Sequence, residues 1–313
     1  MNARRIWKMI LRAAIYAVVR PVIEAFRILP PRAASWTGQV LGGLAAAALP
    51  RFRMEAESNL ARAFPDLSSA ERSRIAAANF RHLGRELGQY LSLTRRDPRV
   101  LKSLVKAEGM DLLEKARSRG KGVIVLTGHM GSWEIAGAFV ALSQPNLAVV
   151  ARDLYDERLN ALLNGFRARF NLKVFDNTDT RGILRHLKYG GILGVLVDQY
   201  SRRVASVPIP FFGKPAPTPV GPVRLAERTG AAIMMGFLTR TNGGYRLALE
   251  KLEAGNDGVA ERWLETFNLR LEAALRENPE QWVWMHDRWA VRSPAAGANR
   301  PPGPALTETG SPS

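Results

Sequence analysis

Residues 122–142 read GVIVLTGHMGSWEIAGAFVAL. Their first part, GVIVLTG, is a short apolar run that is rich in β-branched residues and bounded by glycines, which predicts a buried strand. Their second part, GSWEIAGAFVAL, has the length and apolar spacing of a helix. A strand that leads directly into a helix is typical of a βαβ unit, whose parallel sheet is covered on both faces.

The same alternation continues toward the C-terminus. Short apolar runs recur as NLAVVARD, NLKVFDN, GGILGVLVDQ and AAIMMGFLTR, and helical stretches such as DERLNALLNGFRARF separate most of them. GYRLALEKLE predicts one further strand at the edge of the sheet, and residues 259–278 carry the apolar stripe of a helix. The sequence therefore predicts an α/β fold with a mostly parallel central sheet flanked by helices.

The chain divides into three predicted regions. Residues 1–50 are apolar and basic, and we expect them to form helices that associate with a membrane. Residues 51–292 form the main domain, in which residues 52–120 have helical spacing throughout. Residues 293–313 are dense in Pro, Gly, Ala and Ser and cannot bury enough apolar surface to order themselves, so they predict a disordered tail.

The charge of the chain is strongly basic and unevenly distributed. The 45 Lys and Arg residues exceed the 28 Asp and Glu residues, which gives a net charge of +17 over 313 residues. Residues 1–53 hold nine of the basic residues and one acid, Glu24. A basic field of this size attracts nucleic acid, anionic lipid or an acidic carrier protein, so charge alone does not choose the partner.

The basic segment is also the most apolar one. IWKMILRAAIYAVVRPVIEAFRIL mixes large hydrophobic side chains with spaced arginines, and Arg12 and Arg20 interrupt any uncharged span. About 20 predominantly apolar residues are needed to cross a bilayer, so this segment predicts an amphipathic helix that lies in the membrane interface. An ordinary core helix with a solvated basic face has the same pattern, and Arg12 argues against a signal peptide.

His129 and Glu134 are the candidate catalytic residues. His129 follows the predicted strand, at the carboxyl edge of the sheet where ligands bind in α/β folds, and Glu134 lies about one turn into the helix. A carboxylate beside an imidazole fixes its tautomer and stabilises the imidazolium, so the pair predicts a general base that activates a hydroxyl group. A histidine near a glutamate is also a common structural pair, and the spacing alone does not separate the two readings.

Other kinds of site find no support in the sequence. The chain has no cysteine, which excludes disulfides, thiolate catalysis and thiolate metal ligands. The residue at position 130 is Met, so Ser132 is not in a nucleophile elbow, and no dinucleotide-binding or P-loop motif occurs. Since the four histidines also lack the spacing of metal ligands, we expect neither a metal ion nor a cofactor.

Several ordered blocks of sequence resemble one family. They are ESNLARAFPDLSSAER, HMGSWE, VVARD, LVDQYSRRVASVPIPFFGKPAPTPVGPVRLAERTGAAI and QWVWMHDRW. HMGSWE matches the H-x4-E form of the motif of the lysophospholipid acyltransferase superfamily, and within it the chain resembles the lauroyl and myristoyl transferases of lipid A biosynthesis. Phosphatidylinositol mannoside acyltransferases and related glycolipid acyltransferases share these blocks, so the acceptor stays open.

The resemblance implies a reaction and a location. Such enzymes move an acyl chain from a thioester, usually on acyl carrier protein and otherwise on acyl-CoA, to a hydroxyl group of a lipid A precursor or related glycolipid. His129 would deprotonate that hydroxyl, Glu134 would orient His129, and no covalent acyl-enzyme would form. The resemblance also implies that the protein works at the cytoplasmic face of the inner (plasma) membrane, as a peripheral protein or with a single N-terminal anchor.

Five further residues are candidates for substrate binding. Arg152 follows a predicted strand and suits a phosphate group, although it could equally pair with a nearby aspartate. Asp198 and Gln199 close the strand GGILGVLV at the same edge, where they bind substrate or only cap a turn. Phe212 suits the wall of an acyl channel and Lys214 suits a phosphate, and both fit a packed loop as well.

The remaining candidates are weaker. Arg167 and Arg169 have the spacing of helix-surface residues, and the tryptophans of QWVWMHDRW predict core packing.

Two other classes of protein remain as alternatives. A nucleic-acid-binding protein would explain the basic charge, but no recognised binding module is present. A soluble thioesterase or other hydrolase of the same sheet type would consume the acyl thioester without a lipid acceptor.

Overall fold

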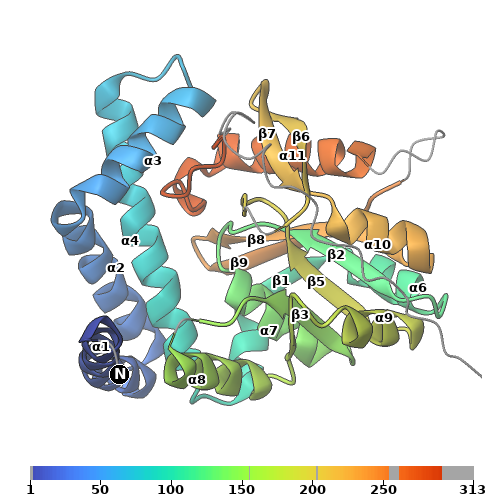
Figure 1. The fold of residues 1–313 in the computed structure, drawn as a ribbon, viewed down its shortest axis with the longest axis horizontal. Coiled ribbons are helices and arrows are strands. Elements are labelled where there is room, and N and C mark those ends of the chain that lie inside the picture. The colour runs from blue at the N-terminus through green and yellow to red at the C-terminus, as the bar shows by residue number, and fades with distance from the viewer. Residues whose placement is uncertain (1–2, 155, 202–203, 254–260, 291–313) are drawn as a thin grey trace, which may run out of the picture.

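The computed structural model describes residues 3–154, 156–201, 204–253 and 261–290. The predicted tail after residue 292 lies outside these residues. A layer of N-terminal helices stands beside a central sheet that carries helices on both faces (Figure 1). The α/β fold with a mostly parallel sheet is therefore confirmed.

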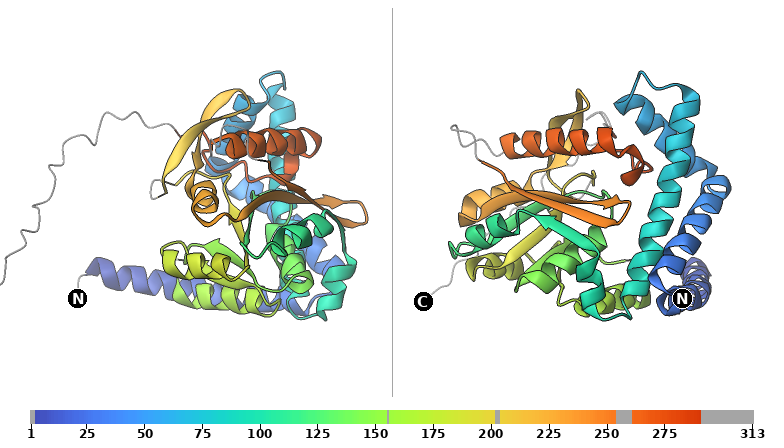
Figure 2. Two further views of the ribbon diagram at one scale, coloured as in Figure 1. Left: turned by 90° about the vertical axis from the view of Figure 1, so that its right-hand side faces the viewer. Right: turned by 180° about the vertical axis from the view of Figure 1, so that it is seen from behind.

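The N-terminal layer consists of long helices: α1 (Ala3–Ile28), α2 (Pro31–Ala48), α3 (Pro50–Ala63) and α4 (Ser69–Leu93). Proline opens α2 and α3, at the position where its missing N–H group leaves no bond unmade. A capping box between Ser68 and Glu71 starts α4. The N-terminal end of α1 projects beyond the rest of the molecule (Figure 2). Within the described ranges, no helix is both long enough and apolar enough to cross a membrane.

The central sheet has the strand order β1-β9-β8-β2-β5-β3-β4. The strands are β1 (Val105–Glu108), β2 (Val123–Thr127), β3 (Leu147–Ala151), β4 (Lys173–Asp176), β5 (Ile192–Leu196), β8 (Ala232–Thr241) and β9 (Gly244–Lys251). All neighbours are parallel except β8 and β9, which form an antiparallel pair. The carboxyl ends of β2 and β5 consequently lie side by side, with Thr127 opposite Leu196.

Successive residues of the central strands enter two separate hydrophobic clusters. Val123 and Ile192 belong to one cluster, and the next residues, Ile124 and Leu193, belong to the other. This alternation is expected for strands that are buried on both faces. Helices α5 (Pro98–Ser103), α6 (Met110–Arg117), α7 (Trp133–Ser143) and α8 (Glu157–Ala168) contribute to the first cluster, and α9 (Thr180–Lys188), α10 (Gly221–Thr229) and α11 (Glu261–Glu277) contribute to the second.

Two details of the sheet differ from the prediction. Residues 105–108 form a strand in the region predicted to be entirely helical, because four residues are too few to show a periodicity of their own. The strand β9 is not at the edge of the sheet, since β1 pairs with its outer side. Pairing partners that come from more than 130 residues away are not visible in a local pattern.

The block that contains Phe212 and Lys214 is a hairpin. The strands β6 (Ser206–Phe211) and β7 (Lys214–Pro219) form a separate antiparallel pair, and a two-residue turn connects them. Both turn residues have positive φ, 49° at Phe212 and 70° at Gly213, as the tightest hairpin turns require. Residues 279–281 form a short 3-10 helix, η1 (Pro279–Gln281), that leads into the buried Trp282.

Candidate active site

His129 lies between the end of β2 and the start of α7, at the carboxyl edge of the sheet. Asp198 lies two residues beyond the end of β5, the strand next to β2. The His129 side chain is about a quarter exposed, whereas the Asp198 side chain is fully buried. The sheet therefore brings together the predicted base and a carboxylate that is 69 residues away in the sequence.

Asp198 accepts three hydrogen bonds. The His129 ring contacts it through Nδ1, 2.8 Å from Oδ1, and the His129 backbone N–H donates to Oδ2 at 2.7 Å. The indole N–H of Trp282 donates to the same Oδ2 at 2.7 Å. A side chain at Gly128 would bring its Cβ within 3.1 Å of the carboxyl group, so glycine gives Asp198 the room to approach.

These contacts fix the ionisation of Asp198 and the tautomer of His129. Burial raises the pKa of Asp198, but the charge of His129 and the hydrogen bonds from His129 and Trp282 outweigh it and hold the pKa below its ordinary value. The carboxylate accepts and cannot donate, so Nδ1 of His129 carries a proton. In the neutral ring, Nε2 is then the free acceptor, which is the form that a general base needs.

Glu134 has a different partner. Its carboxylate receives two hydrogen bonds from the Arg167 guanidinium, Nη2 to Oε1 at 2.5 Å and Nε to Oε2 at 3.1 Å. Both side chains are mostly buried, with 19% and 12% of their surfaces exposed. Glu134 was predicted to orient the His129 ring, but the ring contacts Asp198 instead. Glu134 is bound by Arg167.

Two cavities meet at these residues. The larger has a volume of about 820 Å³ and the smaller about 360 Å³, and His129, Trp133 and Glu134 line both. The His129 and Trp133 rings pack edge to face with their centroids 5.2 Å apart. The imidazole is therefore accessible from both cavities.

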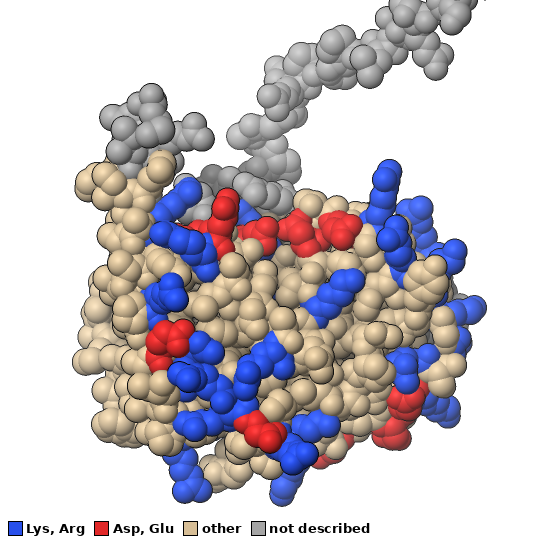
Figure 3. Space-filling view, turned by 90° about the horizontal axis from the view of Figure 1, so that it is seen from below, with Lys and Arg blue, Asp and Glu red and all other residues tan. Residues whose placement is uncertain are grey.

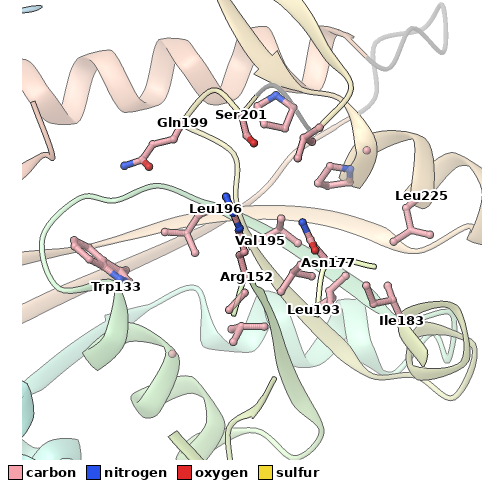
Figure 4. Close-up of a pocket in the computed structure, with 18 of the residues that line it drawn as sticks. Trp133, Arg152, Asn177, Ile183, Leu193, Val195, Leu196, Gln199, Ser201 and Leu225 are labelled. Atoms are coloured by element: carbon pink, nitrogen blue, oxygen red, sulfur yellow. The ribbon is translucent and has the colours of Figure 1, made fainter. Parts of the chain in front are cut away.

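The larger cavity is lined by both apolar and polar side chains. Residues from β3 and β5, including Leu193, Val195 and Leu196, form part of the apolar lining. Figure 4 shows Trp133 on one side and Ile183 and Leu225 on the opposite side. Polar groups line the same cavity: Arg152, Arg167, Asn177, Thr178, Thr180, Gln199 and Ser201.

The smaller cavity is almost entirely apolar and faces α4. Its walls include Leu83, Leu87 and Tyr90 from α4 and Val283 from the C-terminal segment. Leu87 is 60% exposed, so the cavity reaches the surface beside this helix. The two cavities thus approach His129 from different sides of the fold.

The structure gathers most of the predicted site residues and separates two of them. Arg152 and Gln199 line the larger cavity, and Asp198 contacts His129. Phe212, in the hairpin turn, packs against its neighbour Phe211 and against Phe64, which follows α3. The Lys214 ammonium donates to the carbonyl of Arg62 at 3.2 Å. Neither Phe212 nor Lys214 lines the two cavities beside His129.

The sequence did not indicate the contribution of Trp282, which was expected in the core. Trp282 is indeed buried, but its indole N–H also holds Asp198 in place. The nearby His286 has a pKa below its ordinary value because of burial, and it experiences the charges of Asp198 and His129. In the sequence, the only indication of a role for Trp282 and His286 is that both belong to the block QWVWMHDRW.

In the ranges the structure describes, no group of three or more His, Asp or Glu side chains is arranged to hold a metal ion.

Comparison with known proteins identifies the family of this chain. Residues 4–290 match the model of a family described as bacterial lipid A biosynthesis acyltransferase. The chain is 30% identical to the lipid A biosynthesis palmitoleoyltransferase of Escherichia coli over 268 residues, 84% of this chain and 87% of the relative. It is 25% identical to the lipid A biosynthesis lauroyltransferase of the same organism over 257 residues, 80% and 83% of the two chains.

A more distant relative has a different acceptor in its name. The chain is 21% identical to a phosphatidylinositol mannoside acyltransferase of Mycobacterium tuberculosis over 221 residues, which are 69% of this chain and 65% of the relative. The match to the lipid A family is longer and closer, so the resemblance seen in the sequence is confirmed. This protein is an acyltransferase and belongs to the bacterial lipid A biosynthesis acyltransferase family.

Proposed function

We propose that this protein transfers a fatty acyl group from a thioester, carried by acyl carrier protein, to a hydroxyl group of a lipid A precursor, with His129 as the general base. The observation that carries the proposal is the contact between Nδ1 of His129 and buried Asp198, 2.8 Å long, where the two cavities meet. Asp198 orients the ring and stabilises the imidazolium, and Nε2 takes the proton of the acceptor hydroxyl.

The remaining steps follow from the local structure. The acceptor oxygen attacks the thioester carbonyl, and the C–S bond breaks as the new ester bond forms. Ser132 makes no capping hydrogen bond at the start of α7, so the backbone N–H groups of its first turn remain available for the oxyanion. The imidazolium of His129 then returns its proton to the leaving thiolate, and no acyl-enzyme is needed.

Glu134 and Arg167 have a supporting role in this scheme. Their bidentate ion pair lines the larger cavity next to His129 and ties the first turn of α7 to α8. The pair holds that turn in position and keeps the Glu134 charge neutralised. We assign Arg152 and Gln199, in the lining of the same cavity, to the polar part of the thioester donor, where a guanidinium suits its phosphate.

The two substrates enter from different sides. We place the acyl chain in the larger cavity, because its lining of strand residues is apolar and extends to Ile183 and Leu225. We place the acceptor lipid at the smaller cavity, because that cavity is apolar and opens beside Leu87 on α4. The hydroxyl group and the thioester carbonyl then meet at His129.

Transfer and hydrolysis are distinguished by one assay. The purified protein is incubated with an acyl thioester of acyl carrier protein, with a lipid A precursor, with a phosphatidylinositol mannoside or with no acceptor, and products are identified by mass spectrometry. We expect rapid acylation of the lipid A precursor and slow loss of the thioester alone. Equal consumption of the thioester with and without acceptor indicates a hydrolase, and acylation of the mannoside alone indicates the acceptor of the more distant relative.

The size of the larger cavity sets the acyl chain length in this proposal. Replacing Leu225 with tryptophan fills the end of the cavity opposite Trp133. One methylene group in an apolar pocket changes selectivity by about 10–200-fold, so we expect the variant to use the longest accepted donor at least about tenfold more slowly and to prefer shorter chains. Competition between thioesters of different lengths measures this. The control Leu269→Trp changes an exposed leucine outside the cavity, and equal selectivity of both variants would contradict the placement of the chain.

The N-terminal helices are proposed to hold the protein on the membrane surface. Of the 21 large hydrophobic side chains that are exposed among the described residues, 15 lie in residues 7–54. Arg12 and Arg20 accompany them on α1, and Figure 3 shows Lys and Arg side chains outnumbering acidic ones over the face seen from below. Apolar side chains among basic ones suit the interface of an anionic membrane.

Val40 and Leu44 test this attachment, since they are exposed one turn apart on α2. Replacing both with glutamate removes apolar contact and adds negative charge. We expect binding to anionic vesicles, measured by cosedimentation, to fall at least about tenfold. The control Leu269→Glu adds one negative charge on α11, where the leucine is 65% exposed. If both variants bind like the unaltered protein, α2 does not face the membrane.

A further inference from the structure

A third cavity borders a different part of the α4 surface from the smaller cavity beside His129. It has a volume of about 690 Å³ and is bounded by α2, α4 and the turn between β8 and β9. Along α4, Arg81, His82 and Arg85 face this cavity, whereas Leu83, Glu86 and Leu87 face the smaller cavity. The lining is more polar than apolar, unlike that of the two cavities at the candidate active site.

The two helices that border this cavity, α2 and α4, are in close contact. α2 carries glycine at 38 and 42, and α4 carries glycine at 84 and 88. A Cβ at Gly38 would lie 2.1 Å from the carbonyl oxygen of Gly84, and one at Gly84 would lie 2.1 Å from that of Gly38. The two backbones therefore touch, as paired small-xxx-small motifs allow.

The cavity is rich in positive charge that has no partner. Arg32, Arg81 and Arg85 make no hydrogen bond or ion pair with the rest of the described structure, while Glu86 neutralises Arg240 in the wall. Among the residues that the structure describes, Glu280 is the one acidic residue in the lining. Three guanidinium groups around one carboxylate leave a net positive cavity, and such a group of cations is stabilised by an anion.

Arg240, Gln89 and Gln281 in the wall of this cavity belong to a fixed hydrogen-bond network. Tyr245 donates to Glu86 at 2.6 Å, Arg240 donates to Glu86 and Gln89, and the Gln281 side chain joins the backbone of Arg240. His82 is buried there, and burial lowers its pKa, so it adds no charge at neutral pH. The cations thus stand over a polar surface whose own groups are already paired.

One side of the cavity continues into the apolar surface of α2. Trp36 lines the cavity and is 67% exposed, and Val40 and Leu44 follow it at intervals of four residues on the same helix. A tryptophan between charged groups and an apolar face is typical of the level of lipid headgroups. A hollow of this size accepts a headgroup, whereas a helix of an acidic carrier protein needs a longer groove.

We propose that this cavity binds the phosphate group of an anionic membrane phospholipid. Arg32, Arg81 and Arg85 hold the phosphate oxygens, Trp36 lies at the headgroup level and the acyl chains run along the apolar face of α2. None of these arginines lines the cavities beside His129, where the proposed function places the acceptor hydroxyl and the donor.

A binding measurement with soluble lipid tests the site. The full-length protein in a nonionic detergent is titrated with dihexanoylphosphatidylglycerol, with dihexanoylphosphatidylcholine and with inorganic phosphate, and heat is recorded by calorimetry. We expect the anionic lipid to bind more tightly than the other two. Because charge-assisted hydrogen bonds are lost, Arg81→Ala/Arg85→Ala should weaken its binding at least about tenfold.

A matched variant separates the cavity from overall charge. Arg74→Ala/Arg95→Ala also removes two exposed arginines in or just after α4, but outside the cavity, and should bind the lipid within about twofold of the unaltered protein. The single variant Arg32→Ala repeats the test from α2, and thermal melting followed by circular dichroism verifies that each variant is folded.

Four results overturn the proposal. The first is equal weakening of lipid binding by the two double variants, and the second is equal affinity of the unaltered protein for the two lipids. The third is displacement of the anionic lipid by an equal concentration of inorganic phosphate. The fourth is a rise in the KM of Arg81→Ala/Arg85→Ala for acyl carrier protein while its lipid binding is unchanged. The second and third results reject an anionic lipid as the ligand, and the fourth assigns the cavity to the carrier. The calorimetric titration involves no acyl transfer. A negative binding result therefore does not reject the proposed transfer reaction, and a negative transfer assay does not reject the lipid site.

Discussion

Replacing His129 with alanine is expected to lower the rate of acyl transfer by about 10³-fold or more, with the fold intact. The imidazole is the group at the junction of the two cavities whose Nε2 is free to take the acceptor proton, because Nδ1 is bound to Asp198. General-base catalysis is worth about 10²–10⁴-fold, and a lipid alcohol is a poor nucleophile without it. Initial rates with saturating donor and acceptor measure the effect.

A second histidine provides the control for this variant. His186 lies on α9, where its Nε2 is 2.9 Å from the carbonyl oxygen of Ile192, and it lines neither cavity. His186→Gln should therefore keep transfer within a few-fold of the unaltered protein. A folded His129→Ala protein that transfers acyl groups at a near-normal rate would exclude the imidazole as the base.

Asp198→Asn is expected to lower kcat by about 10²–10⁴-fold while KM for the donor changes little. The substitution keeps the size of the side chain but removes the charge that stabilises the imidazolium. It also lets an amide group face Nδ1, which favours the tautomer with the proton on Nε2 and blocks the base. A lost carboxylate that only supported the fold would instead lower the melting temperature and leave kcat of the folded protein intact.

Glu134→Gln is the comparison for Asp198→Asn. Glu134 is bound by Arg167 rather than by the ring, and glutamine keeps one of its two acceptor oxygens for that arginine. We therefore expect a smaller loss of kcat than for Asp198→Asn. A larger loss of kcat for Glu134→Gln than for Asp198→Asn would indicate that Glu134, and not Asp198, orients the ring.

The sequence predicted the local elements around the site because they have strong periodic patterns. The strand of residues 123–127, the helix that begins at Trp133 and the placement of His129 between them all follow from short-range spacing. The strand of residues 105–108 has no such pattern, and it exists because β9 offers it a pairing edge. Its partner is far away in the sequence, so local spacing gave no indication of it.

The partner of His129 shows the same limit. Asp198 was predicted at the correct edge of the sheet, but as a substrate-binding residue, because the order of the strands is not visible in the sequence. Once β5 pairs with β2, Asp198 stands beside His129 and accepts its Nδ1–H. Glu134 was nearer in sequence, but α7 carries its carboxylate to Arg167 of α8.

The hairpin residues illustrate why chemistry alone does not locate a site. Phe212 and Lys214 have side chains suited to an acyl channel and a phosphate. Phe212 and Gly213, both with positive φ, instead form a tight turn, and Lys214 begins β7. Phe212 packs against Phe64, just after α3, and its backbone N–H donates to Glu272 of α11. Trp282 shows the reverse, since an apparent core residue also donates a hydrogen bond to the carboxylate of Asp198.

The kcat of the double variant His129→Ala/Asp198→Asn tests the proposed mechanism most directly, in comparison with the two single variants. If Asp198 acts only through the imidazole, the double variant transfers acyl groups no more slowly than His129→Ala alone, because there is no ring left to orient. If the two losses multiply, Asp198 acts independently of His129, and the oriented-base mechanism is wrong.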